Sequence, residues 1–549
     1  MRPRTDVDLF VRAEVVAGSI PWTRVRTRLA PPRTHPVRVS PILSPSARRT
    51  AAAVPALVLL GLVSALAGTL VGCSDGPETP RAAPADESAP AVVAPTAPSA
   101  PSAPRPDVLV LVLDSLRADR MGGAMRREDE RDLTPMIDGI ARSGLNAVLS
   151  FSPSPHSAPS FASLSSGLAP LVHGVRNVVG EELSVLADEV RTFPEVLQSA
   201  GWRTVLVHES GQILDGAGLF QGIDLVVPTG GLEGSTQALE SVLTSADSDA
   251  PICVIVHSYG AHPPFLPPRD RYGVQFRGRY TEAPGTDPER GGRFRERQEA
   301  LEGFEGNPKG REFAELAEGF LEPYDGMTDD DIAWLRDLYD ENLALVDAQV
   351  GEIFDVWSDH RSFADSLVVL TSGHGLALGD EGRFGVDHGL SGATVRVPLA
   401  ISGPGVTPGI LMSATSTLTV PATVLELCGL QPVPAMEPSL GDLLTVRGVR
   451  DGLEIVPIQS PATGELGVAW IRYVVLERPD ERGRTYYDAF ADPGLLEPVE
   501  LESIVVDRLD SVYASMVQQA EDTARVHRAG TAPLPPRARQ RLRVLGYTQ

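Results

Sequence analysis

The sequence predicts an α/β protein with a doubly wound sheet flanked by helices, followed by a smaller C-terminal α+β subdomain. Residues 107–113, DVLVLVL, are almost wholly apolar, which is typical of a strand buried on both faces of a parallel sheet. Later apolar runs such as PICVIVHS and LVVLTSG alternate with stretches of helical spacing, as βαβ units do. From about residue 407 the pattern breaks into shorter pieces, which indicates the subdomain.

The composition limits the kinds of partner. The 549 residues carry a net charge of −24, although residues 1–72 hold ten Arg against only three acids, so the remainder is more acidic still. Such a body is not attracted to nucleic acid, and it repels anions unless a local positive centre, such as a metal ion, neutralises them. Lys309 is the single lysine of the chain, so arginine supplies nearly all fixed positive charge.

The N-terminal region has the features of an export signal. Residues 48–73 place two arginines before about 21 apolar or small residues and end in LVGC. This ending resembles a bacterial lipobox, in which Cys73 is lipidated and becomes the mature N-terminus. The alternative is an uncleaved transmembrane anchor with a coincidental cysteine. Either interpretation predicts a protein exported to the bacterial cell envelope and held at a membrane.

The remaining chain divides into a tether, a core and a C-terminal part. Residues 73–105 are rich in Pro, Ala and Ser and predict a semi-extended tether. Residues 106–406 form the predicted core, and residues 407–549 form the subdomain. Within the core, residues 269–330 are polar and lack regular apolar spacing, so we expect a long surface insertion near the mouth of the site. Cys253 and Cys428 lie in apolar runs and are expected to be buried thiols.

Polar side chains follow several of the predicted strands. Asp114, His208, His257, Ser372 and His374 each come just after an apolar run. Ligands of open α/β sheets bind at the carboxyl ends of the strands, so these side chains are candidates for one site. Taken alone, an aspartate such as Asp114 has two interpretations, a helix cap or a metal ligand.

Two further segments contain candidate catalytic groups. Ser157 lies before a proline and the start of a predicted helix, where the helix dipole favours negative charge, so it is a candidate nucleophile. The alternative is a turn with an ordinary helix cap. His262, in the segment VHSYGAHPPFLPP, lies in a loop after a strand, where a histidine is more often solvated than catalytic.

Taken together, four segments resemble the sulfatase family of the alkaline phosphatase superfamily. They are VLVLVLDSLRADRMGG, SAPSFASLSSG, VHSYGAHPPFLPP and LVVLTSGHG, in the order and with the flanking sequence of that family. The resemblance covers residues 106–549 and implies an alkaline-phosphatase-like fold. It implies that Asp114 and His374 bind one divalent ion (Ca, Mg, Mn or Zn), that Ser157 occupies the nucleophile position, and that His262 contacts the substrate.

The sequence departs from the family pattern where the family places charge. Phe161 occupies the position of an arginine that follows the nucleophile, which argues against conversion of Ser157 to formylglycine. Ser115 and Gly373 stand where metal-binding carboxylates are expected. Nor does the chain offer the family's active-site lysines, because Lys309 lies in the insertion.

Other side chains are candidates to replace the missing ligands. Ser115, Asp380, Asp387 and His388 lie close in sequence to the predicted metal ligands, and we name them as possible auxiliary ligands. Their participation depends on how the loop after His374 folds, which the sequence does not determine.

Two functions remain open from the sequence. One is metal-assisted hydrolysis or transfer of a sulfate or phosphate ester, with a small anionic ester or a sulfated glycan as substrate. The other is a catalytically inactive pseudo-sulfatase that acts as a surface-tethered binding protein.

Overall fold

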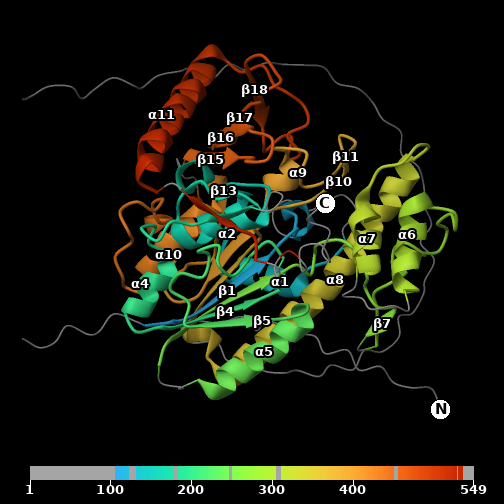
Figure 1. Ribbon diagram of the computed structural model, residues 1–549, viewed down its shortest axis with the longest axis horizontal. Helices are drawn as coiled ribbons and strands as arrows, with labels where there is room; N and C mark the ends of the chain where they lie inside the picture. Colours follow the sequence, from blue (N-terminus) through green and yellow to red (C-terminus); the bar gives the residue numbers. More distant parts are fainter. Residues whose placement is uncertain are drawn as a thin grey trace, which may run out of the picture. The chain divides into compact units, whose positions relative to one another are not determined.

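A nine-stranded sheet forms the centre of the protein, in the order β14-β13-β2-β12-β9-β1-β6-β4-β5 (Figure 1). The computed structural model describes residues 105–122, 131–177, 182–209, 211–246, 250–271, 273–304, 311–450, 455–527, 529–535 and 539. The strands are β1 Asp107–Leu113, β2 Leu145–Phe151, β4 Arg203–His208, β5 Leu225–Pro228, β6 Ile252–Ser258, β9 Ser366–Thr371, β12 Leu399–Ser402, β13 Gly409–Ser416 and β14 Gly448–Arg450. Only β12 runs antiparallel to its neighbours, so the predicted doubly wound sheet is confirmed.

Helices cover both faces of this sheet (Figure 1). They are α1 Pro135–Ser143, α2 Ser157–Ser166, α3 Pro170–His173, α4 Phe193–Ser199, α5 Leu232–Ser245, α6 Gly292–Glu302, α7 Arg311–Glu318, α8 Asp329–His360, α9 Gly392–Val395, α10 Val420–Leu427 and α11 Ser503–His527. Short 3-10 turns are η1 Ala118–Arg120, η2 Gly319–Leu321, η3 Phe363–Asp365, η4 Thr417–Thr419 and η5 Gly441–Leu444.

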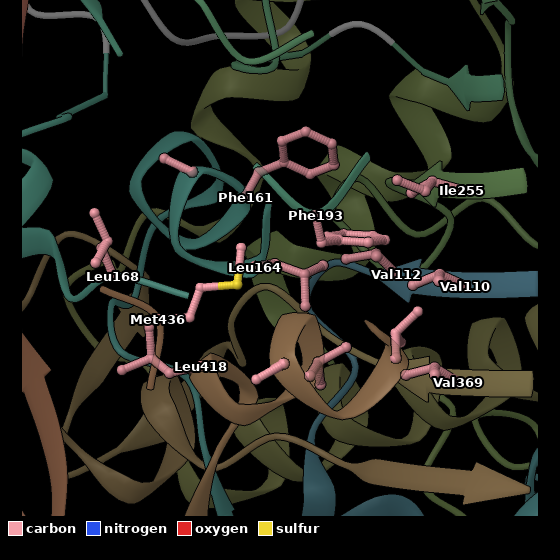
Figure 2. Packing of buried hydrophobic residues seen from close by; sticks show 14 of the residues in the cluster. Val110, Val112, Phe161, Leu164, Leu168, Phe193, Ile255, Val369, Leu418 and Met436 are labelled. Carbon is pink, nitrogen blue, oxygen red and sulfur yellow. The ribbon is translucent and has the colours of Figure 1, made fainter. Parts of the chain in front are cut away.

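Strand β1 shows why the sheet is buried on both sides. Successive side chains of a strand point to opposite faces. Val110 and Val112 therefore pack into the cluster formed with α2, α4 and α10, whereas Leu109 and Leu111 pack into the cluster formed with α1, α5 and α8. Figure 2 shows Val110 and Val112 among the apolar side chains of the first cluster. The uninterrupted apolar run predicts this burial, and the structure confirms it.

The long helix α8 begins with a capping box. The Thr328 hydroxyl accepts from the Asp331 backbone N–H, and the Asp331 carboxylate accepts from that of Thr328. Further along α8, the buried carboxylate of Asp347 accepts hydrogen bonds of 2.9–3.1 Å from the first N–H groups of α1. The first backbone N–H groups of a helix have no partner within that helix. Asp347 of α8 accepts from those of α1 and so holds the start of α1 against α8.

The insertion of residues 269–330 is more ordered than its polar composition predicts. It contains α6, α7 and the strand pair β7 Asp270–Arg271 and β8 Val274–Gln275, and it buries Phe294 and Phe320. Glu341 of α8 holds its first part, because its fully buried carboxylate accepts from the backbone N–H groups of Gly278, Tyr280 and Thr281 at 2.7–3.0 Å. A single distant acid therefore organises this segment, which no local pattern reveals.

The C-terminal subdomain is an antiparallel sheet covered by α11. Its strands are β15 Ile455–Gln459, β16 Leu466–Trp470, β17 Tyr473–Glu477 and β18 Arg484–Asp488. The expected boundary at residue 407 differs from the structure, because β13, β14 and α10 still belong to the main sheet and its cover. The separate sheet begins at Ile455. Three short pairs complete the chain: β3 Glu182–Val185 with β19 Gly530–Pro533, β10 Ala377–Asp380 with β11 Arg383–Gly385, and β7 with β8.

The predictions for the N-terminus, the tether and Cys73 lie outside the described residues. Among the helices of the described part of the chain, none is both long and apolar enough to cross a membrane. Cys253 and Cys428 are buried free thiols, as predicted.

Candidate active site

The carboxyl ends of three neighbouring strands bring the predicted residues together. Strand β1 lies between β6 and β9 and is parallel to both. Asp114 follows β1, His257 is near the end of β6, and His374 follows β9, so all three reach the same edge of the sheet. Ser115, next to Asp114, has a φ of 68° and donates its N–H to the His374 carbonyl at 2.9 Å, which ties two of these loops together.

Asp114 is the charged centre of the site. Its carboxylate is fully buried. One oxygen accepts from the Gly373 N–H at 3.0 Å, and the other lies 3.1 Å from His257 Nε2 and 3.6 Å from His374 Nε2. Burial by itself raises the pKa of Asp114, but attraction to His257 and His374 outweighs it and holds this pKa well below its usual range. Asp114 is therefore an anion at neutral pH.

Ser157 and His374 form a hydrogen-bonded pair. Ser157 is the first residue of α2, and its Oγ lies 3.1 Å from His374 Nε2. His374 Nδ1 lies 2.8 Å from the Gly375 carbonyl, which only accepts, so Nδ1 carries the proton and Nε2 can accept. The Ser157 hydroxyl thus has two acceptors within reach, His374 Nε2 and the Asp114 carboxylate. Burial lowers the pKa of His374, against the opposing effect of Asp114. The imidazole is thus neutral and oriented as a base for Ser157.

His262 lies on the more open side of this pair. Its side chain is only half-buried, and its ring centroid lies 6.5 Å from that of His374 and 5.6 Å from that of Tyr259. Its Nδ1–H donates to the Pro263 carbonyl at 2.8 Å, which leaves Nε2 as an acceptor. Burial lowers the pKa of His262 to about 4. The structure therefore brings Asp114, Ser157, His262 and His374 into one site.

Two residues of the site were not predicted from the sequence. Tyr259 follows β6, its hydroxyl accepts from the Gln212 N–H at 3.0 Å, and it interacts with Ser157. Glu209 follows β4 and accepts from the Ser258 hydroxyl at 2.6 Å and from the Tyr259 N–H at 3.0 Å. Both lie one residue beyond a strand; Glu209 directly follows His208, and Tyr259 comes two residues after His257. Their position at the strand ends is the signal that could have found them.

The possible auxiliary ligands do not join Asp114. Asp380 pairs with Arg117 at 2.7 Å. Asp387 is exposed and lies 3.1 Å from His156 Nε2, beside Ser157. This hydrogen bond lowers the pKa of Asp387. His388 is also exposed, and the buried Ser115 hydroxyl makes no hydrogen bond.

The donor set falls short of what a divalent ion requires. Such an ion needs several anionic or basic ligands around one common point. Here His257 Nε2 is hydrogen-bonded to the Asp114 carboxylate and His374 Nε2 to Ser157, and within the described residues no group of three His, Cys, Asp or Glu is arranged to hold a metal. A side chain at position 373 has no room either, because a Cβ added to Gly373 would lie 2.3 Å from Asp114 Oδ1. The expected metal ion therefore does not fit the residues present.

The positive charge expected beside the nucleophile is replaced by apolar packing. Phe161 of α2 is 3% exposed, and its ring meets that of His257 edge-on with centroids 5.6 Å apart. Figure 2 shows Phe161 and Phe193 in the same apolar layer as Val112. Apolar side chains thus line this side of the site.

Comparisons with known proteins agree with this fold. The profile of the sulfatase family matches residues 106–224 and 231–430, more than half of the chain. A choline-sulfatase of Rhizobium meliloti (strain 1021) is 29% identical over 204 residues, 36% of this chain and 37% of its own length. A sulfatase of Formosa agariphila is 27% identical over 155 residues, 28% of this chain and 29% of its own. The aligned segments thus span about a third of these relatives.

Solved structures match over a larger part of the chain. BT4656, described in complex with its substrate D-glucosamine-2-N,6-O-disulfate, superposes with a TM-score of 0.58 at 17% identity, covering 77% of this chain and 98% of its own. A phosphonate monoester hydrolase of Agrobacterium radiobacter has a TM-score of 0.56 at 19% identity, and the match covers 76% of this chain and 96% of that protein. At this identity the likeness concerns the fold.

Proposed function

This chain belongs to the sulfatase family, and we propose that it hydrolyses or transfers sulfuric or phosphoric esters with an unmodified Ser157 as nucleophile. The observation that carries the proposal is the 3.1 Å hydrogen bond between Ser157 Oγ and His374 Nε2 at the carboxyl edge of the sheet. A hydroxyl at a helix N-terminus, paired with a neutral imidazole, is the arrangement that activates a serine.

The chain's own residues account for the proton movements. His374 Nε2 accepts the Ser157 proton as Oγ attacks, and its Nδ1–H remains fixed on the Gly375 carbonyl. The imidazolium formed is stabilised by Asp114, whose carboxylate lies 3.6 Å from Nε2, and it gives its proton to the alcohol that leaves as the ester bond breaks. Water or an acceptor alcohol then gives a proton to His374 and takes the sulfate or phosphate group from Ser157, whose Oγ recovers that proton. His262, whose ring lies beside that of His374, contacts the ester or its leaving group. By likeness to relatives named as choline-sulfatase and to the glucosamine disulfate complex, the substrate is a small sulfate ester or a sulfated glycan.

A second candidate function is binding without turnover. Gly373, Phe161 and Ser115 occupy the three positions where charge is expected, and the metal ion does not fit the ligands present. A pseudo-sulfatase would retain the fold and a ligand pocket but not the reaction. The two candidates differ in one measurable property: only the enzyme cleaves an ester at a rate that depends on Ser157.

The test is ester cleavage by the purified full chain. Aryl sulfate, aryl phosphate and aryl phosphonate are assayed with the wild type, Ser157→Ala and Ser165→Ala, a buried serine on the same helix that does not line the site. We expect Ser157→Ala to lower the rate by at least about 100-fold and Ser165→Ala to leave it unchanged. A rate equal in all three proteins would refute the proposal in favour of the binding protein.

We also propose that the protein is exported and anchored in the cell envelope through lipidated Cys73. The support is the sequence of residues 48–73, with two arginines, an apolar run and the terminal LVGC. Metabolic labelling with a fatty-acid analogue should mark the wild type but not Cys73→Ala, which should be released from membranes. A Cys73→Ala protein that stays membrane-bound would instead support the uncleaved transmembrane anchor.

A further inference from the structure

A cavity of about 480 Å³ lies between the core and the C-terminal subdomain, where η4, the loop after α10, β15 and α11 meet. Its volume is in the range of about 300–1,000 Å³ that is usual for small-molecule sites. None of its lining residues lines the small void beside Ser157. The turn η4 borders both, since Thr417 lines that void whereas Leu418 and Thr419 line the cavity. The cavity is therefore a separate site for a ligand.

Much of the cavity lining is apolar. Leu418 of η4 and Val512 and Met516 of α11 line it, together with Ile455 and Pro457 of β15. Although it is a large apolar residue, Ile455 is 41% exposed, and Met516 is half-buried. A hydrocarbon group bound here would remove apolar surface of both residues from water, which favours binding.

Glu437 is the one charged residue among the described residues that line the cavity. Its backbone N–H donates to the Gly167 carbonyl at 2.9 Å, which fixes its position against the end of α2. Its side chain is half-buried, and its carboxylate has no hydrogen bond or ion pair with any described residue. Burial raises the pKa of Glu437, and no positive group opposes this effect. A bound cation would supply the missing partner.

The rest of the lining favours a primary ammonium ion. Quaternary ammonium ions are recognised by the faces of aromatic rings, and none of the described lining residues is aromatic. A divalent metal ion needs several oxygen ligands, and a single carboxylate does not provide them. A primary ammonium has three N–H donors. The Glu437 carboxylate can accept from it, as can the side chains of Ser515 and Gln519, which line the cavity and are exposed.

We propose that this cavity, the Glu437 cavity, binds a primary alkylammonium ion. The ammonium group contacts the Glu437 carboxylate, and the alkyl group packs against Leu418, Val512 and Met516. The net charge of −24 raises the local concentration of such cations around the protein. This inference goes beyond the proposed function, because it requires no reaction at Ser157.

The test of the ligand class is isothermal titration calorimetry of the purified full chain with n-hexylammonium. We expect saturable binding at one site. Hexanoate and 1-hexanol, which share the alkyl chain but lack the positive charge, should bind at least about 10-fold more weakly. Butylammonium should also bind more weakly, by about three- to fourfold for each buried methylene that it lacks. Absence of saturable binding, or equal binding of hexanoate, would overturn the proposal.

The role of Glu437 is tested by a substitution that keeps its shape. Glu437→Gln should weaken hexylammonium binding at least about 10-fold, because the carboxylate charge is lost. Glu497→Gln removes an exposed carboxylate that does not line the cavity, so it serves as the matched control and should bind as the wild type does. Equal affinity of the wild type and Glu437→Gln would overturn the assignment of Glu437.

The location is tested by filling the cavity from an exposed position. Ser515→Trp places a large side chain in the lining, whereas Ala514→Trp places the same side chain on an exposed neighbour of α11 outside it. We expect Ser515→Trp to abolish hexylammonium binding and Ala514→Trp to retain it. Wild-type affinity in Ser515→Trp would overturn the location.

A last variant separates this inference from the proposed function. Ser157→Ala should bind hexylammonium as tightly as the wild type, because Ser157 does not line the Glu437 cavity. Loss of binding in Ser157→Ala would place the ion in the candidate active site and overturn the inference. Because the titration measures binding alone, its outcome does not depend on whether any ester is cleaved.

Discussion

Gly373→Ala is the perturbation whose effect follows most directly from the structure. A Cβ at this position would lie 2.3 Å from Asp114 Oδ1, roughly 1 Å closer than ordinary contacts allow. The carboxylate must then move and give up its 3.0 Å hydrogen bond from the Gly373 N–H or its 3.1 Å contact with His257. A hydrogen bond to a buried charge contributes about 1.5–3 kcal/mol, and overpacking costs about 1–3 kcal/mol. We therefore expect a loss of about 2.5–6 kcal/mol in the free energy of unfolding.

The assay is urea unfolding of the full chain, with Gly139→Ala as the control. Gly139 lies within α1, and a Cβ there meets no atom within 4 Å, so this substitution should be neutral or stabilise by up to about 1 kcal/mol. If Gly373→Ala unfolds at the wild-type urea concentration, the contact between Gly373 and Asp114 does not hold the site together. The steric clash with Asp114 would then not explain why a side chain is excluded at position 373.

Three further predictions concern the metal, the pH dependence and the insertion. The residues around Asp114 do not form a site for a divalent ion, so Mn²⁺ or Ca²⁺ should leave the melting temperature of the wild type unchanged; a rise in that temperature with either ion would contradict this reading of the donor set. Burial raises the pKa of Asp347 to about 7 from its usual 3.8, so the folded state holds an extra proton between these values and this group's contribution to stability falls as the pH rises from about 4 to 7. Asp347→Asn should therefore flatten the dependence of the urea midpoint on pH over this window, by at most about 4 kcal/mol, and an unchanged profile would count against the buried acid. Glu341→Ala should cost about 3–5 kcal/mol and speed amide exchange at Thr281, whereas unchanged exchange would show that other contacts hold the insertion.

The site residues were predictable to the extent that they follow strands. The apolar residues before Asp114 and before His374 predict buried parallel strands. Parallel strands have their carboxyl ends at the same edge of the sheet. Tyr259 and Glu209 also directly follow strands, so their place at this edge could have been predicted, but their hydrogen-bond partners could not. Their roles come from partners distant in sequence, such as the hydroxyl of Ser157 for Tyr259.

The insertion and the domain boundary show the same limit for the fold. Composition predicts a polar surface segment at residues 269–330, because few apolar residues recur at helical spacing there. The segment is nevertheless ordered by the buried carboxylate of Glu341, an acid on a helix outside it. Likewise β13 reads as part of a separate subdomain until its pairing with β2 assigns it to the central sheet. Hydrogen-bond partners that are far apart in the chain leave no periodic signal.

By itself, the sequence determined the α/β class, the membership of the sulfatase family and the positions of Asp114, Ser157 and His374, because periodicity and motif order are local properties of the chain. It also showed that Gly373 and Phe161 replace charged residues. Only the tertiary structure decided what these replacements do. Gly373 lets its backbone N–H reach Asp114 where a side chain would collide, and Phe161 joins the hydrophobic core. Whether a lost ligand leaves a gap or is replaced by packing depends on distances of a few ångströms between distant segments, and those distances exist only in the folded chain.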